Sequence, residues 1–332
     1  MKKILNQAAH YVDEMLEGMI LAHPDIYAQP SRRVVARARG AAEGQVGIVS
    51  GGGSGHLPVF TGYVGEGFLS ACAVGDVFAS PSAEQMAEAI RLADRGKGVL
   101  CLYGNYGGDV MNFDMACEMV DLENDISTST VLLTDDVVSA PRSEAAKRRG
   151  VGGMVFAFKI AGAAADEGLD LAGVTAAAQK AADNLVSIGM ALTPCIIPQH
   201  GKPTFELGEN EMEMGMGIHG ERGIYRSAIK TADEIADEML DQLVSDQPLE
   251  AGARIALLVN SLGATPQEEL YILYRRLSAR LDALGVTVAG LLIGRYATSM
   301  EMTGMTLTVL KLDADLERWL KAPAHCAFWS VA

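Results

Sequence analysis

The chain has 332 residues, 49% of them hydrophobic and 21% charged, so it falls in the ordinary globular range and is long enough for two domains. A formal net charge of −15 argues against nucleic acid and anionic membranes as partners, because both are polyanions. Five scattered cysteines without a CxxC pair indicate buried thiols in a reducing compartment. Since no eighteen apolar residues run together and no signal-peptide core is present, we expect a cytoplasmic protein.

The first predicted elements lead to a glycine-rich stretch. Apolar spacing over residues 4–22 predicts an amphipathic helix that ends before Pro24. Residues 46–49 predict a buried strand that runs into a loop, GGGSGH, at residues 51–56. Glycines let a ligand approach main-chain N–H groups, and His56 adds a titratable group at the end of the loop. The alternative is a surface turn with an incidental histidine.

Two more strand-to-helix connections follow. Residues 68–77 predict a strand, after which Ser80 is expected to cap a helix with Pro81 at its first position. The strand at residues 98–103 runs through Gly104 towards Asp109 and a helix at residues 111–120. Ligands of α/β sheets bind at such carboxyl ends of strands, so Asp109 is a candidate general base. Its other interpretation is a helix N-cap.

A third strand, residues 130–133, ends at Asp135 and Asp136. Two adjacent carboxylates can hold Mg²⁺, but we favour a solvated turn at the end of the strand. Residues 154–160 predict a fourth strand, and the alanine-rich residues 161–182 predict a pair of tightly packed helices. We place a domain change near Asn184, which gives domains of residues 1–184 and 185–332.

The second half repeats the alternation of strands and helices. Residues 210–221 alternate in the manner of a strand and close on His219, whose flanking Gly217 and Gly220 leave its imidazole free to meet a ligand. Met214 and Met216 are expected in the core. Helices open at the capping box at Thr231 and near residue 265, and strands are expected at residues 254–259, 288–293 and 306–312. The predicted fold class is α/β, with two α/β domains that each place a sheet between helices.

Two classes of site fit the glycine stretch. A phosphate-binding loop is one, but the chain has no GxxxxGK(S/T) motif and no GxGxxG followed by a helix and a distant acid. The loop also carries no lysine to balance a triphosphate. A site for a small polar substrate, with two histidines and an aspartate, is therefore favoured.

Six motifs now identify a family. GGGSGHxPxxxGYVGEG, VFASP, NYGGDxxNF, GKPxF, EMEMGMGIHGE and LGATPxxELY resemble, in order and spacing, the substrate-binding subunit of dihydroxyacetone kinases, the DhaK family. The resemblance covers essentially the whole chain. It implies a two-domain α/β subunit that forms homodimers.

The resemblance also implies roles for individual residues. His219 is expected to add to the ketone carbonyl as a hemiaminal, which selects ketones over polyols. Asp109 matches the base that draws the proton from the hydroxyl being phosphorylated, and His56 matches the residue that supports this hydroxyl and the developing charge. Six further positions match the substrate pocket: Gly52, Gly53, Ser54, Phe78, Ser80 and Gly104.

The family pattern places the nucleotide elsewhere. It implies no cofactor and no metal on this chain, with ADP or ATP and Mg²⁺ on a DhaL-type partner. The phosphoryl donor is either a phosphotransferase-system protein or free ATP. This chain is expected to be inert alone.

Three departures from the better-known bacterial members concern the substrate. Leu57 replaces a glutamate, Gly104 replaces a lysine, and Arg222 replaces a common proline. Loss of the lysine is expected to open space, so a tetrulose such as erythrulose is an alternative to dihydroxyacetone. A ketose-sensing co-regulator is a further alternative, although retention of Asp109 argues for catalysis.

Overall fold

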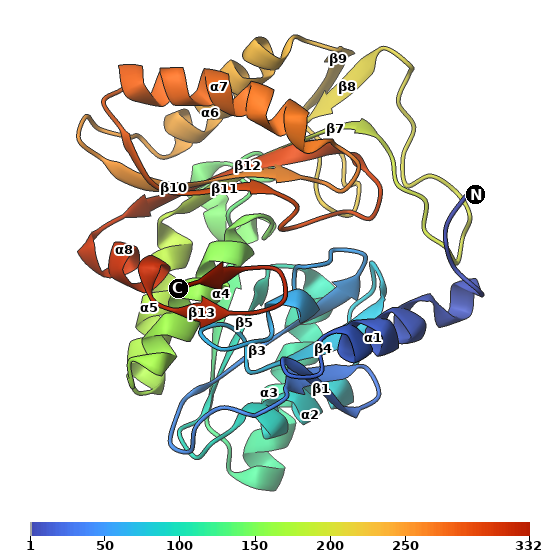
Figure 1. Cartoon of the computed structure of the whole chain (residues 1–332), viewed down its shortest axis with the longest axis vertical. Helices are drawn as coiled ribbons and strands as arrows, with labels where there is room; N and C mark the ends of the chain where they lie inside the picture. The colour runs from blue at the N-terminus through green and yellow to red at the C-terminus, as the bar shows by residue number, and fades with distance from the viewer. Residues whose placement is uncertain (1) are drawn as a thin grey trace.

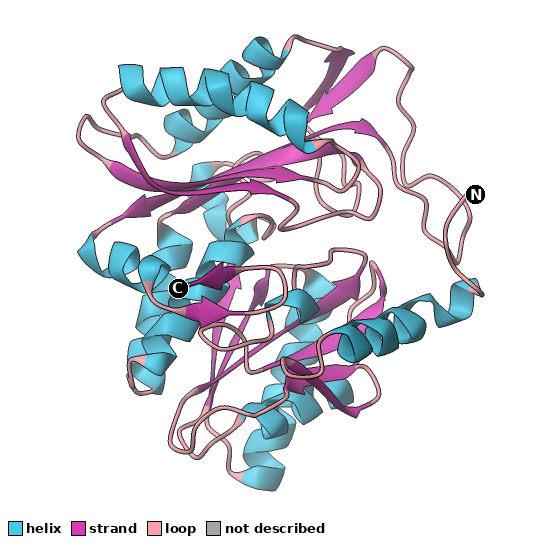
Figure 2. Ribbon diagram, in the orientation of Figure 1, coloured by secondary structure: helices cyan, strands magenta, loops and turns pink. Residues whose placement is uncertain are grey.

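The computed structural model describes residues 2–332 and contains two six-stranded sheets with helices on both sides of each (Figures 1 and 2). The predicted α/β class is therefore confirmed. The first sheet has the spatial order β1-β2-β4-β3-β5-β6, in which β3, β4, β5 and β6 are parallel. Its strands are β1 (Tyr27–Ser31), β2 (Val34–Arg37), β3 (Gly47–Ser54), β4 (Ala71–Val77), β5 (Val99–Gly104) and β6 (Thr128–Leu133).

The second sheet is mixed and has the order β11-β10-β12-β7-β8-β9. Only β10 and β11 pair in parallel among the strands described for it. Its strands are β7 (Leu185–Thr193), β8 (Glu211–Met214), β9 (Tyr225–Ala228), β10 (Arg254–Ser261), β11 (Thr287–Gly294) and β12 (Thr303–Leu312). The strands predicted at residues 254–259, 288–293 and 306–312 are thus confirmed. The segment expected as a strand at residues 210–221 is extended only over β8, and residues 215–221 form a turn instead.

The helices form three layers around the two sheets (Figure 1). α2 (Ala83–Ala93) and α3 (Gly107–Asn124) cover the outer face of the first sheet, and α6 (Ala232–Asp246) and α7 (Gln267–Ala283) cover the outer face of the second. Three helices lie between the sheets: α4 (Gly153–Asp166), α5 (Leu171–Asp183) and α8 (Ala314–Lys321).

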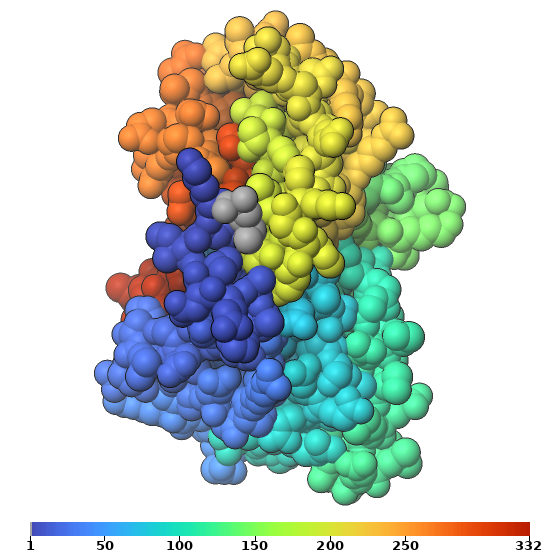
Figure 3. Space-filling view, turned by 90° about the vertical axis from the view of Figure 1, so that its right-hand side faces the viewer, coloured from blue at the N-terminus to red at the C-terminus, as the bar shows by residue number. Residues whose placement is uncertain are grey.

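The two ends of the chain tie the halves together. After the short 3₁₀ turn Ala8–His10, α1 (Tyr11–Ala22) lies on the first half. Figure 3 shows the N-terminal segment, in dark blue, lying against the yellow segment around residue 200. The final strands β13 (Ala324–His325) and β14 (Ser330–Val331) return to the first half, where Trp329 packs 5.4 Å from the Phe68 ring. The division of the chain at Asn184 stays a prediction.

Two local predictions were wrong at the level of elements. The expected helix at residues 4–22 begins only at Ala8, and Ile4 is fully exposed. The expected strand at residues 154–160 is the first part of α4, which is buried almost all round because it lies between the sheets. A short apolar run cannot distinguish a buried strand from a buried helix.

The cap of α2 also differs from the prediction. Ser82, not Ser80, is the N-cap, and it forms a capping box with Gln85. The predicted capping box at Thr231 is confirmed, since its hydroxyl accepts from the Glu234 N–H. No helix within residues 2–332 is long and apolar enough to cross a membrane.

Candidate functional site

Residues 51–54 of the glycine stretch are the end of strand β3, and other groups of the protein pack directly against their backbone. A Cβ at Gly52 would lie 2.3 Å from the Phe60 ring, and one at Gly53 would lie 2.7 Å from the Ala79 main-chain nitrogen. Ser54 is buried, and its hydroxyl donates to the Gly75 carbonyl at 2.8 Å. Close packing of the protein's own groups therefore explains these residues, where the sequence suggested the approach of a ligand.

His56 follows the strand and is buried against the second half of the chain. Its Nδ1 lies 2.7 Å from the Thr298 carbonyl oxygen, so Nδ1 carries the proton and Nε2 keeps a lone pair. Nε2 is buried without a hydrogen-bond partner among residues 2–332. Burial, together with His219, lowers the pKa of His56 to about 3. The ring is therefore neutral at physiological pH, and its Nε2 can only accept a hydrogen bond.

His219 lies in the turn after β8, where Glu221 holds it from two sides. The Nδ1 atom is 2.9 Å from Glu221 Oε1, and the His219 main-chain N–H donates to Oε2 at 2.9 Å. Burial alone would raise the pKa of Glu221, but the hydrogen bond and charge of His219, with Arg149, lower it to about 2. An ionised Glu221 keeps the proton on Nδ1, which leaves Nε2 as the free nucleophilic nitrogen.

Three aromatic rings from the first half surround the His219 imidazole. The His56 ring centroid is 4.6 Å away, that of Tyr106 is 4.7 Å away and that of Phe78 is 5.3 Å away, all in edge-on contact. Phe78 also stacks on His56 at 4.9 Å. The structure thus brings together two histidines that are far apart in the sequence, inside an aromatic enclosure.

Asp109 lies in the first turn of α3, whose N-cap is Tyr106, so the N-cap interpretation of Asp109 was wrong. The carboxyl group is buried, and its Oδ1 has no hydrogen-bond partner in the described chain. Burial raises the pKa of Asp109 to about 6, against the lowering effects of the Ser80 hydroxyl and His219. Ser80, which does not cap α2, packs against the same turn, since a Cβ at Gly108 would lie 2.6 Å from its Oγ.

The space expected beside Gly104 is filled. A Cβ there would lie 3.1 Å from the Tyr106 ring, 3.3 Å from the Gly150 carbonyl oxygen and 3.3 Å from the Met154 sulfur. The Tyr106 hydroxyl donates to that same carbonyl at 3.0 Å. The expectation that the missing lysine opens space was therefore wrong, because Tyr106 occupies this position and packs on His219.

The groups that hold the two histidines in place were not predicted from the sequence. Glu221 stood inside a quoted motif, but nothing in the sequence showed that it would bond to a side chain two residues earlier. The Thr298 carbonyl is a main-chain atom and leaves no signal at all. An Arg149 guanidinium nitrogen lies 4.0 Å from a Glu221 carboxylate oxygen. Sequence analysis singled out Asp135 and Asp136 in this region but not Arg149.

That acidic pair is structural. Asp135 and Asp136 are both buried, so the predicted solvated turn was wrong. Asp135 accepts from the N–H groups of Val151 and Gly153 and from the Ser187 hydroxyl, and Asp136 pairs with Arg149. Residues 2–332 contain no group of three or more His, Cys, Asp or Glu side chains placed to hold a metal ion.

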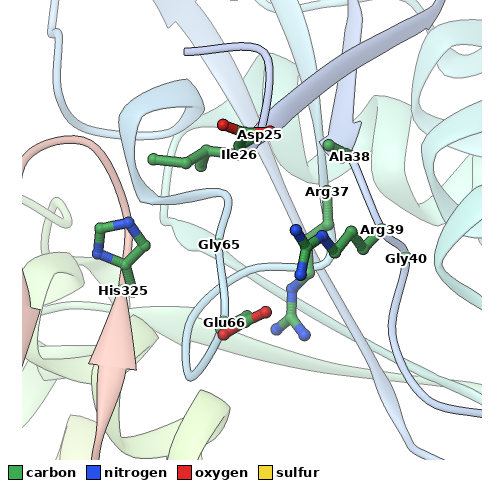
Figure 4. A pocket seen from close by; sticks show the side chains of 9 residues that line it. All are labelled: Asp25, Ile26, Arg37, Ala38, Arg39, Gly40, Gly65, Glu66 and His325. Atoms are coloured by element: carbon green, nitrogen blue, oxygen red, sulfur yellow. The ribbon is translucent and has the colours of Figure 1, made fainter.

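The surface pocket of Figure 4 is separate from these residues. It has a volume of about 230 Å³ and lies between the end of β2 and strand β13. Its described lining mixes both signs of charge, with Arg37 and Arg39 facing Glu66 across the hollow. Leu57 borders another pocket, beside Tyr11 and Met300.

Comparison with known proteins finds relatives that cover essentially the whole chain. The Dak1 domain model matches residues 17–328. The chain is 44% identical to the dihydroxyacetone-binding subunit DhaK of the PTS-dependent dihydroxyacetone kinase 2 of Listeria innocua, covering 100% of both chains. It is 42% identical to the L-erythrulose kinase of Pectobacterium atrosepticum, over 98% of this chain and 55% of that protein.

A solved structure is similarly close. The dihydroxyacetone kinase operon co-activator Dha-DhaQ matches with a TM-score of 0.90 and 30% identity, covering 98% of this chain and 99% of that chain. The resemblance seen in the sequence motifs is confirmed by both the family model and the full-length relative. The chain therefore belongs to the Dak1 domain family.

Proposed function

We propose that this chain is the substrate-binding subunit of a small-ketose kinase, in which His219 holds the ketose covalently. The observation that carries this proposal is the arrangement of His219. Its Nδ1 is fixed by Glu221, its Nε2 is free, and Asp109 offers an unpartnered carboxylate oxygen nearby.

The covalent step is an addition. The lone pair of His219 Nε2 attacks the ketone carbon, the C–N bond forms and the C=O π bond breaks. The former carbonyl oxygen takes a proton from solvent to give a hemiaminal. The imidazole ring becomes a cation in this step, because Nδ1 keeps its proton. Glu221 already accepts the Nδ1–H bond, so it stabilises the charge that the addition creates.

Phosphoryl transfer then needs a base and a hydrogen-bond acceptor for the terminal hydroxyl. Asp109, with a pKa of about 6, is largely ionised at neutral pH and still basic enough to draw the proton. His56 accepts a hydrogen bond through Nε2, so it orients a substrate hydroxyl. In this tautomer Nε2 carries no proton, so it cannot donate a hydrogen bond to a developing negative charge. Of the two roles expected from the sequence, His56 keeps only the contact with the hydroxyl.

The pocket residues take supporting roles in the same proposal. The Phe78 ring contacts both His56 and His219, and Ser80 lies beside Asp109 in the first turn of α3. Gly52, Gly53 and Gly104 act by allowing the close packing that positions Phe60, the 78–79 segment and Tyr106. Ser54 acts through its hydroxyl, which donates to the Gly75 carbonyl. The substrate would then meet the aromatic enclosure and the two histidines.

The nucleotide belongs to another chain in this proposal. The sequence has no P-loop, and the Listeria relative is named as one subunit of a PTS-dependent kinase. ADP or ATP with Mg²⁺ would therefore bind to a DhaL-type partner. Either a phosphotransferase-system protein phosphorylates the bound ADP, or the bound nucleotide exchanges with free ATP. A cytoplasmic homodimer completes the proposal.

The test uses the purified chain with dihydroxyacetone. Intact-protein mass spectrometry after rapid desalting, without chemical reduction, should show an adduct with the mass of the substrate. Addition of a DhaL-type partner and a phosphoryl donor should then produce the ketose phosphate. Asp109→Ala should keep the adduct and lose turnover. An adduct that survives His219→Ala would refute the covalent role of His219.

A tetrulose is the second candidate substrate, and it rests on one comparison. Identity to the L-erythrulose kinase is 42%, nearly the 44% found for the DhaK subunit, so overall similarity does not favour the triose. Kinetics with dihydroxyacetone and both erythrulose enantiomers, using the same partner, decide between them. A clear preference for the triose would remove the tetrulose proposal.

A ketose sensor is the third candidate, because the Dha-DhaQ co-activator shares the fold. A sensor needs His219 to trap the ketone but needs no base. The buried Asp109 with its raised pKa therefore favours the kinase. Ketone binding without any transfer, in the presence of partner and donor, would reverse this preference.

A further inference from the structure

Two cysteine thiols meet behind the helix that carries Asp109. Cys101 lies in β5 and is fully buried, while Cys117 lies in α3 and is half-buried. Their sulfur atoms are 3.8 Å apart. The pair is thus a direct contact between the first sheet and its outer helix layer.

The surroundings make the two thiols unequal. The Cys101 sulfur lies 3.8 Å from the Cys117 sulfur, and the donors that act on Cys117 include the Thr128 and Thr130 hydroxyls of β6, an edge strand in which Thr130 pairs with Cys101. These donors, led by Cys101, lower the pKa of Cys117 to about 7 although burial opposes them. The hydrogen bond to Cys117 and burial raise the pKa of Cys101. A substantial share of Cys117 is therefore thiolate at neutral pH, beside a protonated Cys101 and at a position that solvent reaches.

We propose that Cys117 is an oxidation site and that its oxidation by hydrogen peroxide ends in a disulfide with Cys101. The Cys117 thiolate attacks one peroxide oxygen, the S–O bond forms, the O–O bond breaks, and the leaving hydroxide takes a proton to become water. The Cys101 sulfur then attacks the sulfenic acid, the S–S bond forms, and a second water leaves with the Cys101 proton. Two thiols are oxidised by two electrons, and one peroxide is reduced to two waters.

Disulfide formation also acts on the helix that carries Asp109. The sulfur atoms must close from 3.8 Å to about 2.05 Å. Cys101 is fixed in the ladder between β3 and β6, so most of the movement falls on α3. This consequence rests on the proposed kinase function. Because a displacement of about 1 Å can cost a hundredfold in rate, we expect phosphoryl transfer to fall tenfold or more while His219 still forms its adduct.

The first experiment needs no variant and no kinase activity. The full chain is treated with hydrogen peroxide, and its mass should fall by two hydrogen atoms, with peptide mapping that links Cys101 to Cys117 and reversal by dithiothreitol. Cys326→Ser is the matched control, since Cys326 is buried with a pKa raised to about 11, and it should form the same link. Peroxide treatment that leaves both thiols free, or that links other cysteines, overturns the proposal.

The second experiment assigns the attacking sulfur and tests the consequence. In Cys101→Ser, dimedone should trap a sulfenic acid on Cys117, whereas Cys117→Ser should give no dimedone adduct on Cys101. Trapping on Cys101 overturns the assignment of Cys117. The linked protein is then compared with its reduced form for ketone adduct and for transfer, and an unchanged transfer rate overturns the coupling to Asp109 while leaving the kinase proposal intact.

Discussion

Replacing Asp109 with asparagine should make the protein more stable and inactive. The carboxyl group is buried, one of its oxygens has no partner within residues 2–332, and its pKa is raised from 3.8 to about 6. A raised carboxyl pKa means that folding opposes the charged form. The buried charge therefore destabilises the fold wherever the group is ionised, and the amide of asparagine removes that charge at nearly the same volume.

The pH dependence follows from the two pKa values. Below 3.8 the group is neutral in both folded and unfolded chains, so the substitution changes little. The cost of the charge grows as pH rises from 3.8 to 6 and is then constant. The rise of the pKa from 3.8 to about 6 corresponds to roughly 3 kcal/mol at pH 8, and to less than about 1 kcal/mol at pH 4.

Urea unfolding of the wild type and of Asp109→Asn, measured across this pH range, checks the prediction. Asp114→Asn is the matched control, because Asp114 is exposed on the same helix, and it should change stability by less than about 0.5 kcal/mol at every pH. A gain that is equal at low and high pH would show that the stabilisation does not come from the buried charge, and the argument for a poised base would fail with it.

Three further predictions concern His219, its partner Glu221, and Gly52 in strand β3. His219→Ala should abolish the ketone adduct seen by mass spectrometry, and urea unfolding should show that the variant still folds cooperatively. Glu221→Gln removes a charged partner of Nδ1 and should lower the adduct population by roughly 10- to 100-fold, as expected for a charge-assisted hydrogen bond of about 1.5–3 kcal/mol. Gly52→Ala should destabilise the fold by about 1–3 kcal/mol, because its Cβ would lie 2.3 Å from the Phe60 ring, whereas Gly18→Ala, with open space around it in α1, should stabilise it slightly.

Much of the fold could be predicted because local chemistry determines it. The strands at β5, β10 and β12 are apolar runs bounded by polar residues, and the capping box at Thr231 uses side chains only three residues apart. The site residues His56, Asp109 and His219 stood out for a similar reason, since each follows a strand and a glycine. Their roles as a group remain proposals that the experiments above address.

Long-range contacts explain the predictions that were wrong. The first part of α4 was predicted as a strand because it is a short and mostly apolar run, and its position between two sheets is what stabilises a helix that is buried almost all round. Asp135 was expected in solvent, but it binds the start of α4 and Ser187 of the second sheet. Neither outcome follows from spacing, since the partners are distant in the sequence.

The chemistry of His56 shows most directly why the site requires both halves of the chain. The GGGSGH motif fixes where this imidazole lies but cannot say which nitrogen carries the proton. That proton is held by the Thr298 carbonyl, 242 residues away, and the ring then packs against His219, the proposed nucleophile, which comes from the second half. In turn the His219 ring is enclosed by His56, Phe78 and Tyr106 of the first half. Each half thus sets the protonation or the orientation of the other's histidine, so a change that shifts the contact at Thr298 should alter hydroxyl recognition without touching a side chain of the motif.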